Sequence, residues 1–136
     1  MTPSERVGYA NKARSLKFRR EIISYLNAHG FPDVVSAPEP LGMSVAERLR
    51  EKRGDLLGLE PWVVSVRARE TTFDLSEGMD RVRWIAENAA SPFWCLIQMR
   101  RQRPDLDQAT VVMSLAVFTR VLLLLEQLRA TDEEHS

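Results

Sequence analysis

The chain has 136 residues, of which 44% are hydrophobic and 28% are charged, and its 19 basic and 19 acidic residues give a formal net charge of zero. This length and composition predict one globular domain with its own hydrophobic core. The zero net charge excludes a protein whose whole surface binds nucleic acid, although a local basic patch is compatible with it. The single cysteine, Cys95, excludes a disulfide framework, and the apolar run FWCLI around it predicts a buried side chain.

The first half of the chain predicts one long helix followed by short strands. Ile22, Ile23 and Leu26 recur at helical spacing. Gly30 supplies a helix stop, and His29 beside it is expected to interact with the helix C-terminus. The expected elements are a flexible or partner-ordered arm at residues 1–8, a helix over about Tyr9–Ala28, a strand at Asp33–Ala37, a short helix over Val45–Lys52, and strands at Asp55–Leu57 and Trp62–Ala68.

The second half predicts two further helices and two strands. Met79, Val82 and Ile85 lie on the apolar side of a helix. Trp84 and Trp94 are both expected in or near the core. The expected elements are a helix from Asp74 or Ser76 to Ala90, a buried strand at Phe93–Met99, a polar turn at Arg100–Asp107, a strand at Ala109–Met113, a helix at Leu115–Arg129, and a polar acidic tail at residues 130–136.

The order helix, strands, helix, strand, strand, helix predicts an α/β fold, with a mixed sheet flanked by helices in one domain over residues 9–129. The last helix is apolar on more than one face, so it must be covered on several sides, either by its own domain or by a subunit or partner. The most hydrophobic stretch, Val111–Leu125, contains Arg120 and is shorter than the roughly 20 apolar residues that span a bilayer. No membrane anchor is therefore expected.

The stretch RGDLLGLEPWVVSVRAR, residues 53–69, contains an Arg-Gly-Asp turn followed by two predicted strands. With the helix NKARSLKFRREIISYLNAHGF before it and FWCLIQMRR and ATVVM after it, this stretch resembles the PD-(D/E)XK nuclease superfamily. The likeness is to small Holliday-junction-resolvase-like proteins of phages, and it covers about Asn11–Leu125. The resemblance implies a restriction-endonuclease-like mixed sheet.

In that family two carboxylates hold Mg²⁺, which polarises the scissile phosphate, and a nearby Lys assists. Asp55 matches the first metal-binding Asp of the family. Ser65 stands in place of the second carboxylate, and Arg67 stands in place of the Lys. Arg19 follows the aromatic Phe18, where the family often has a Glu. Because a hydroxyl is a weak Mg²⁺ ligand and Arg cannot serve as a base, Asp55, Ser65 and Arg67 are expected to form a vestigial site without a cofactor.

Three arrangements of Asp55 remain open from the sequence. If a metal ligand has migrated, Glu60, Glu70 or Asp74 would complete a Mg²⁺ site with Asp55. In the second arrangement Asp55 pairs with a nearby arginine and holds two strands together, and in the third it is exposed to solvent or does not correspond to the family's Asp. The candidate arginines for that pairing are Arg67 and Arg69.

Two groups of basic residues could contact nucleic acid or a protein partner, or could be ordinary solvated surface. They are Lys12, Arg14, Lys17, Arg19 and Arg20 in the first helix, and Arg100, Arg101 and Arg103 after the FWCLI strand.

The sequence therefore predicts a non-catalytic phage structural or interaction protein on a nuclease-like fold, with a head-to-tail connector of the virion as its specific version. Its expected partners are further copies of itself or other phage proteins, in the host cytoplasm and then in the virion. The alternatives are a Mg²⁺-dependent DNA endonuclease or Holliday junction resolvase, and a protein that binds DNA without cleaving it.

Overall fold

The structure is a computed structural model that describes residues 2–38, 53–68, 75–100 and 105–135. The described part has the predicted order of helix, strands, helix, strands and helix, while the helix expected over Val45–Lys52 lies outside it. Its elements are α1 (Pro3–Ala28), β1 (Val35–Ser36), β2 (Leu56–Leu57), β3 (Trp62–Arg67), α3 (Leu75–Asn88), β4 (Phe93–Gln98), the 3-10 turn η1 (Leu106–Gln108), β5 (Thr110–Val112) and α4 (Leu115–His135).

The central sheet is mixed and has the strand order β3-β4-β5. β3 and β4 are parallel, with Trp62 opposite Phe93 and Arg67 opposite Gln98, and β5 runs antiparallel to β4. Parallel neighbours need a long crossover, which α3 supplies here. β1 and β2 form a separate antiparallel pair. The prediction of an α/β fold with a mixed sheet between helices is therefore confirmed.

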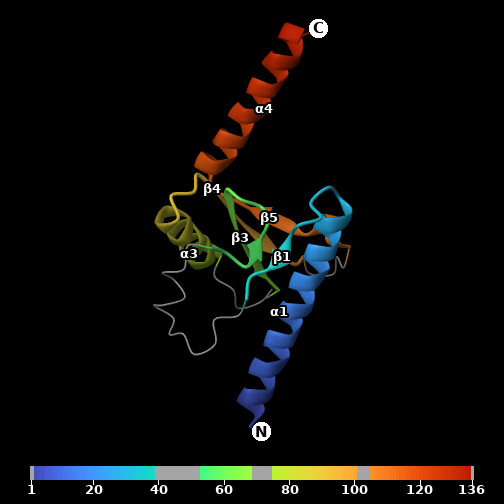
Figure 1. Cartoon of the computed structure of the whole chain (residues 1–136). Coiled ribbons are helices and arrows are strands. Elements are labelled where there is room, and N and C mark those ends of the chain that lie inside the picture. Colours follow the sequence, from blue (N-terminus) through green and yellow to red (C-terminus); the bar gives the residue numbers. More distant parts are fainter. Residues whose placement is uncertain (1, 39–52, 69–74, 101–104, 136) are drawn as a thin grey trace.

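Helices cover both faces of the sheet (Figure 1). Alternate side chains of a strand point to opposite faces. Val64 and Val66 pack with α1, where Phe18 is almost fully buried. Val63 belongs to a second cluster on the other face, together with the apolar stripe of α3 and with Trp94, Leu96 and Val117. The sheet thus separates an α1 side from an α3 side.

The chain before β2 runs close along the outer edge of β3. The backbone N–H of Asp55 donates a 2.7 Å hydrogen bond to the carbonyl of Val64. Gly54 is required at this approach, because a Cβ atom there would lie 2.2 Å from the same carbonyl oxygen. The edge of β3 is therefore covered by this segment instead of being open for pairing.

α1 and α4 extend from the sheet in opposite directions (Figure 1). α1 begins at Pro3 instead of about Tyr9, and α4 continues to His135 instead of ending at Arg129. Along the described side chains of α4, Val117 alone is buried. Burial of the last helix within its own domain, one of the two expected arrangements, is therefore wrong for most of its length.

Individual core predictions had mixed outcomes. Trp94 and Cys95 are buried as expected, and Nδ1 of His29 lies 2.6 Å from the carbonyl oxygen of Tyr25 at the end of α1. Trp84 is 41% exposed, so its expected core position is wrong. None of the helices in the described ranges has the length and apolar character needed to cross a membrane.

Candidate functional site

Asp55 lies against the outer edge of β3, where its side chain replaces part of a neighbouring strand. Its Oδ2 accepts a 2.8 Å hydrogen bond from the backbone N–H of Val66. Its own N–H bonds to Val64, so the residue contacts β3 through both backbone and side chain. This arrangement satisfies polar groups at the strand edge, where an unpaired buried N–H would be costly.

The second oxygen of Asp55 is occupied by a cation from α1. Nη2 of Arg19 lies 3.2 Å from Oδ1, with side-chain exposures of 17% for Arg19 and 27% for Asp55. Nη1 of Arg19 also lies 3.4 Å from Oγ of Ser36 in β1. One guanidinium therefore links α1, β1 and the edge of β3.

The sequence predicted a different partner for this carboxylate. Arg67 or Arg69 was expected, whereas the ion pair in the structure is made by Arg19, and residue 69 lies outside the described ranges. From the sequence, Arg19 belongs to the basic group of the first helix. One sequence signal could have identified Arg19 as the partner of Asp55: it is a cation at the position where the nucleases that the sequence resembles often carry an acid.

Ser65 and Arg67 do not gather around the carboxylate of Asp55. Since Val64 and Val66 face α1, strand alternation places Ser65 and Arg67 on the opposite, α3 side of the sheet. Ser65 is only 5% exposed. Of the three residues expected at the vestigial site, Asp55 therefore lies at the edge of β3 beside Arg19. Ser65 and Arg67 lie within β3, on the face of the sheet away from Arg19.

Within the described residues, none of the candidate replacement ligands brings a second carboxylate to Asp55. Oε1 of Glu60 lies 3.3 Å from the backbone N–H of Gly58, within its own turn. Glu70 and Asp74 lie outside the described residues. Within the described ranges, no group of three or more His, Cys, Asp or Glu side chains is placed to hold a metal ion.

Residues from both predicted basic groups meet at one surface pocket of about 380 Å³ between α1 and the end of β4. Arg14 and Lys17 come from α1, and Arg100 follows β4. Glu21 and Asp105 line the same pocket, and Nζ of Lys17 lies 3.9 Å from Oε1 of Glu21. The mixture of signs makes this a weaker phosphate site than the sequence alone suggested.

The remaining basic candidates do not extend this pocket. Lys12 belongs to α1, the exposed Arg20 is not among the lining residues, and Arg101 and Arg103 lie outside the described residues. The one cysteine is not a candidate nucleophile, because burial raises the pKa of Cys95 to about 12.

No protein-family model, curated protein or solved structure gives a significant match to this chain. The functional argument therefore rests on the arrangement at Asp55 and on the surfaces that the fold leaves exposed.

Proposed function

We propose that this chain is a non-catalytic interaction protein on a nuclease-like, PD-(D/E)XK-type domain. The observation that carries the proposal is the Arg19–Asp55 ion pair. Where a hydrolytic site would hold a divalent cation between carboxylates, this domain holds a guanidinium against one carboxylate. The pair ties α1 to the sheet and performs a structural role.

The electrostatics of Asp55 support this reading. One carboxylate oxygen faces Arg19 and the other accepts the Val66 N–H. A Mg²⁺ ion needs near-octahedral oxygen coordination and usually at least one available carboxylate. To bind here it would have to displace the arginine and break the contact with β3. Hydrolysis of a phosphodiester through such a metal would also lack the second acid and the Lys of the resembling nucleases.

The exposure of α4 supports a role in protein contacts. This helix extends beyond the sheet (Figure 1), and most of its large apolar side chains are exposed. Monomeric proteins rarely leave a contiguous apolar surface of this kind uncovered. With the phage resemblance of the sequence, the specific version of the proposal is a subunit of the virion neck or head-to-tail connector, made in the host cytoplasm and incorporated during assembly.

The test is incubation of the full chain with branched and linear DNA in Mg²⁺ or Mn²⁺, together with thermal unfolding in the presence and absence of each ion. We expect no cleavage and no stabilisation by either metal, because binding of a divalent ion would have to compete with Arg19.

The decisive comparison is between Asp55→Asn and Asp80→Asn, which remove one carboxylate each, the second from an exposed position on α3. Cleavage that persists in Asp80→Asn and disappears in Asp55→Asn would contradict the proposal and establish the endonuclease alternative.

A further inference from the structure

One stripe of α4 has the pattern of a helix that pairs with another helix. Phe118, Val121, Leu125 and Leu128 are spaced by three, four and three residues, which places them along one side of the helix. Val121 is half-buried at its base, whereas the other three are between 46 and 64% exposed. The stripe therefore continues outward from the domain with nothing from its own described chain covering its outer part.

The uncovered apolar surface is large for a chain of this size. Seven large apolar side chains of α4 are between 46 and 78% exposed. They lie on the stripe, on its flanks and, at Leu123, on the opposite side of the helix, and exposed apolar side chains in such number are rare on monomers. These side chains are Leu115, Phe118, Leu122, Leu123, Leu124, Leu125 and Leu128.

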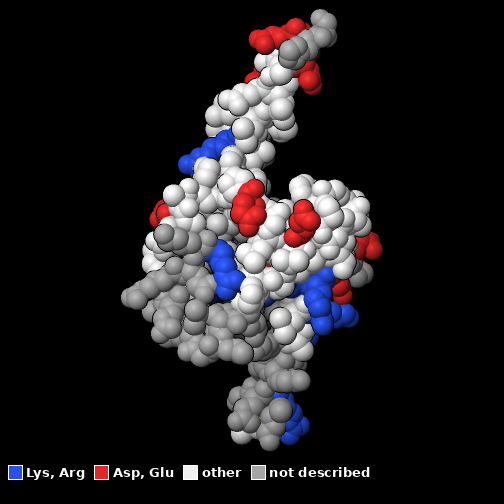
Figure 2. Space-filling view, in the orientation of Figure 1, with Lys and Arg blue, Asp and Glu red and all other residues white. Residues whose placement is uncertain are grey.

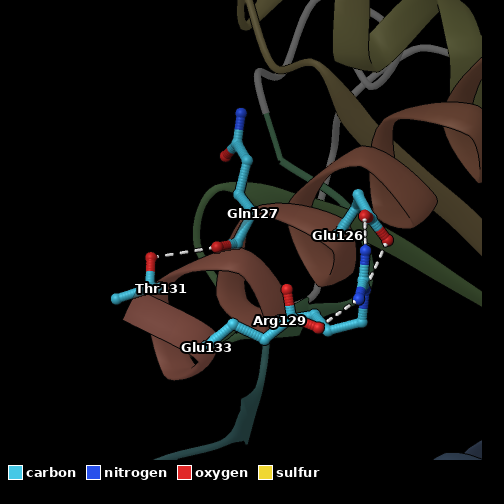
Figure 3. Close-up of polar contacts among 5 residues, drawn as sticks. All are labelled: Glu126, Gln127, Arg129, Thr131 and Glu133. Atoms are coloured by element: carbon cyan, nitrogen blue, oxygen red, sulfur yellow. Dashed lines mark hydrogen bonds and ion pairs between the residues drawn. The ribbon is translucent and has the colours of Figure 1, made fainter. Parts of the chain in front are cut away.

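Contacts within the outer half of α4 support its helical form without help from the rest of the domain. Arg129 bonds to Glu126 one turn before it, and its Nη1 lies 2.6 Å from Oε1 of Glu133 one turn after it (Figure 3). Oγ1 of Thr131 donates a 2.9 Å hydrogen bond to the carbonyl of Gln127. The ion pairs of Arg129 favour an exposed helix, so the outer part of α4 presents its apolar side chains from a formed helix.

The charges of α4 indicate the direction of its neighbour. The first turn of the helix has no acidic residue, whereas Asp132, Glu133 and Glu134 lie near its free end, where Figure 2 shows red side chains beyond a largely uncharged stretch. Acidic side chains are unfavourable at the C-terminus of their own helix and favourable at an N-terminus. An antiparallel neighbour places these acids beside the N-terminus of the adjoining α4, where Oγ of Ser114 accepts the 3.2 Å hydrogen bond from Val117 N–H.

A parallel neighbour would have the opposite effect. Asp132 continues the stripe four residues beyond Leu128, so parallel helices would bring two Asp132 carboxylates together on the contact side. Like charges in such positions destabilise a pair. The acidic end of α4 therefore selects against the parallel arrangement.

We infer that α4 pairs with α4 of a second copy of this chain, antiparallel, about a two-fold axis that crosses the stripe side of the helix at the level of residue 123. One register then satisfies every position of the stripe, because the residue numbers of each contacting pair are symmetric about 123. Phe118 meets Leu128 of the other copy, Val121 meets Leu125, and Asp132 meets Ser114. An isologous contact of this kind is the usual interface of a homodimer. The inference rests on the proposed interaction role and names its partner.

The first test is the mass of the full chain in solution, measured by light scattering over a range of concentrations. We expect a dimer, and we expect Leu125→Glu to raise its dissociation constant on the order of 100-fold, because a charge would be placed in the centre of the contact. Gln127→Glu adds the same charge on the polar side of the same helix and is expected to leave the dimer intact. A wild-type monomer at all concentrations would overturn the inference.

The second test fixes the direction of the helices. Two variants, Phe118→Cys and Leu128→Cys, are prepared with different tags in a Cys95→Ala background, mixed and oxidised. The antiparallel register predicts a disulfide between the two different chains. Disulfides only between identical chains would indicate a parallel pair and overturn the inference. Either failure leaves the non-catalytic proposal standing, which falls only if Asp55-dependent DNA cleavage is observed.

Discussion

Nη2 of Arg19 lies 3.2 Å from Oδ1 of Asp55, so a side chain of α1 neutralises the carboxylate at the outer edge of β3. The contact joins two elements that are distant in the sequence. It also explains how an acid with limited exposure is tolerated beside the apolar α1 side of the sheet, since a partly buried charge requires a partner.

Asp55 has two separable roles, as an ion-pair partner and as a hydrogen-bond acceptor for Val66. We expect Asp55→Ala to lower the free energy of unfolding by about 2–3 kcal/mol, because it leaves both Arg19 and the Val66 N–H without their partner. Asp55→Asn keeps an acceptor and should cost only about 1 kcal/mol. Urea denaturation measures both values. Equal losses in the two variants would show that the Val66 bond contributes nothing.

Gly54 is expected to tolerate no side chain, because its approach to Val64 leaves no room for a Cβ atom. Gly54→Ala must push the segment away from β3 and weaken the contacts of Asp55, at a cost on the order of 2–4 kcal/mol. Gly30→Ala is the comparison: its φ of +105° strains an alanine, but nothing lies within 4 Å, so about 1 kcal/mol is expected. Urea denaturation ranks the two variants, and a smaller loss at Gly54 would contradict the close approach.

Local patterns were sufficient to predict the order of elements and most of their bounds. The β-branched run of β3 and the apolar run of β4 identify strands because their side chains must fill both faces of a covered sheet. The exposure of Trp84 could also have been recognised. It lies two residues, or about 200° of helix rotation, after the buried Val82, away from the stripe that faces the sheet.

The partner of Asp55 and the environment of α4 could not be predicted in the same way. Ion pairing depends on where α1 crosses the edge of β3, which no local spacing encodes, so closeness in sequence favours Arg67 and Arg69 instead. For α4, an apolar pattern indicates that something covers the helix, but the pattern is the same whether the cover is its own domain or another chain.

The buried thiol of Cys95 makes stability depend on pH in the alkaline range. Burial raises its pKa from 9.0 to about 12, so above pH 9 the unfolded chain loses this proton while the folded chain keeps it. The contribution is fully present below pH 9 and decreases by about 1.4 kcal/mol per pH unit between pH 9 and about 12.

Cys95→Ala lacks this titration, so its free energy of unfolding should fall less steeply with pH over the same range. Denaturation of both proteins between pH 8 and about 10.5, followed by subtraction of the two curves, isolates the effect from other groups that titrate there. Parallel curves for the two proteins would show that the thiol ionises as readily in the folded chain as in the unfolded one.

If the guanidinium of Arg19 occupies the place of a metal ion, then a variant with an acidic residue at position 19 should bind a divalent metal ion beside Asp55. Arg19→Glu brings a second carboxylate close to Asp55, and their repulsion should destabilise the protein by about 2 kcal/mol or more in the presence of a chelator. Two converging carboxylates are a minimal site for a divalent cation, so millimolar Mn²⁺ or Ca²⁺ should recover part of this loss as a rise in melting temperature. Ser65→Glu is the matched comparison, because its carboxylate would lie on the α3 side of the sheet and should show no such recovery. Metal-dependent recovery in Ser65→Glu and none in Arg19→Glu would mean that the site faces the other side of β3.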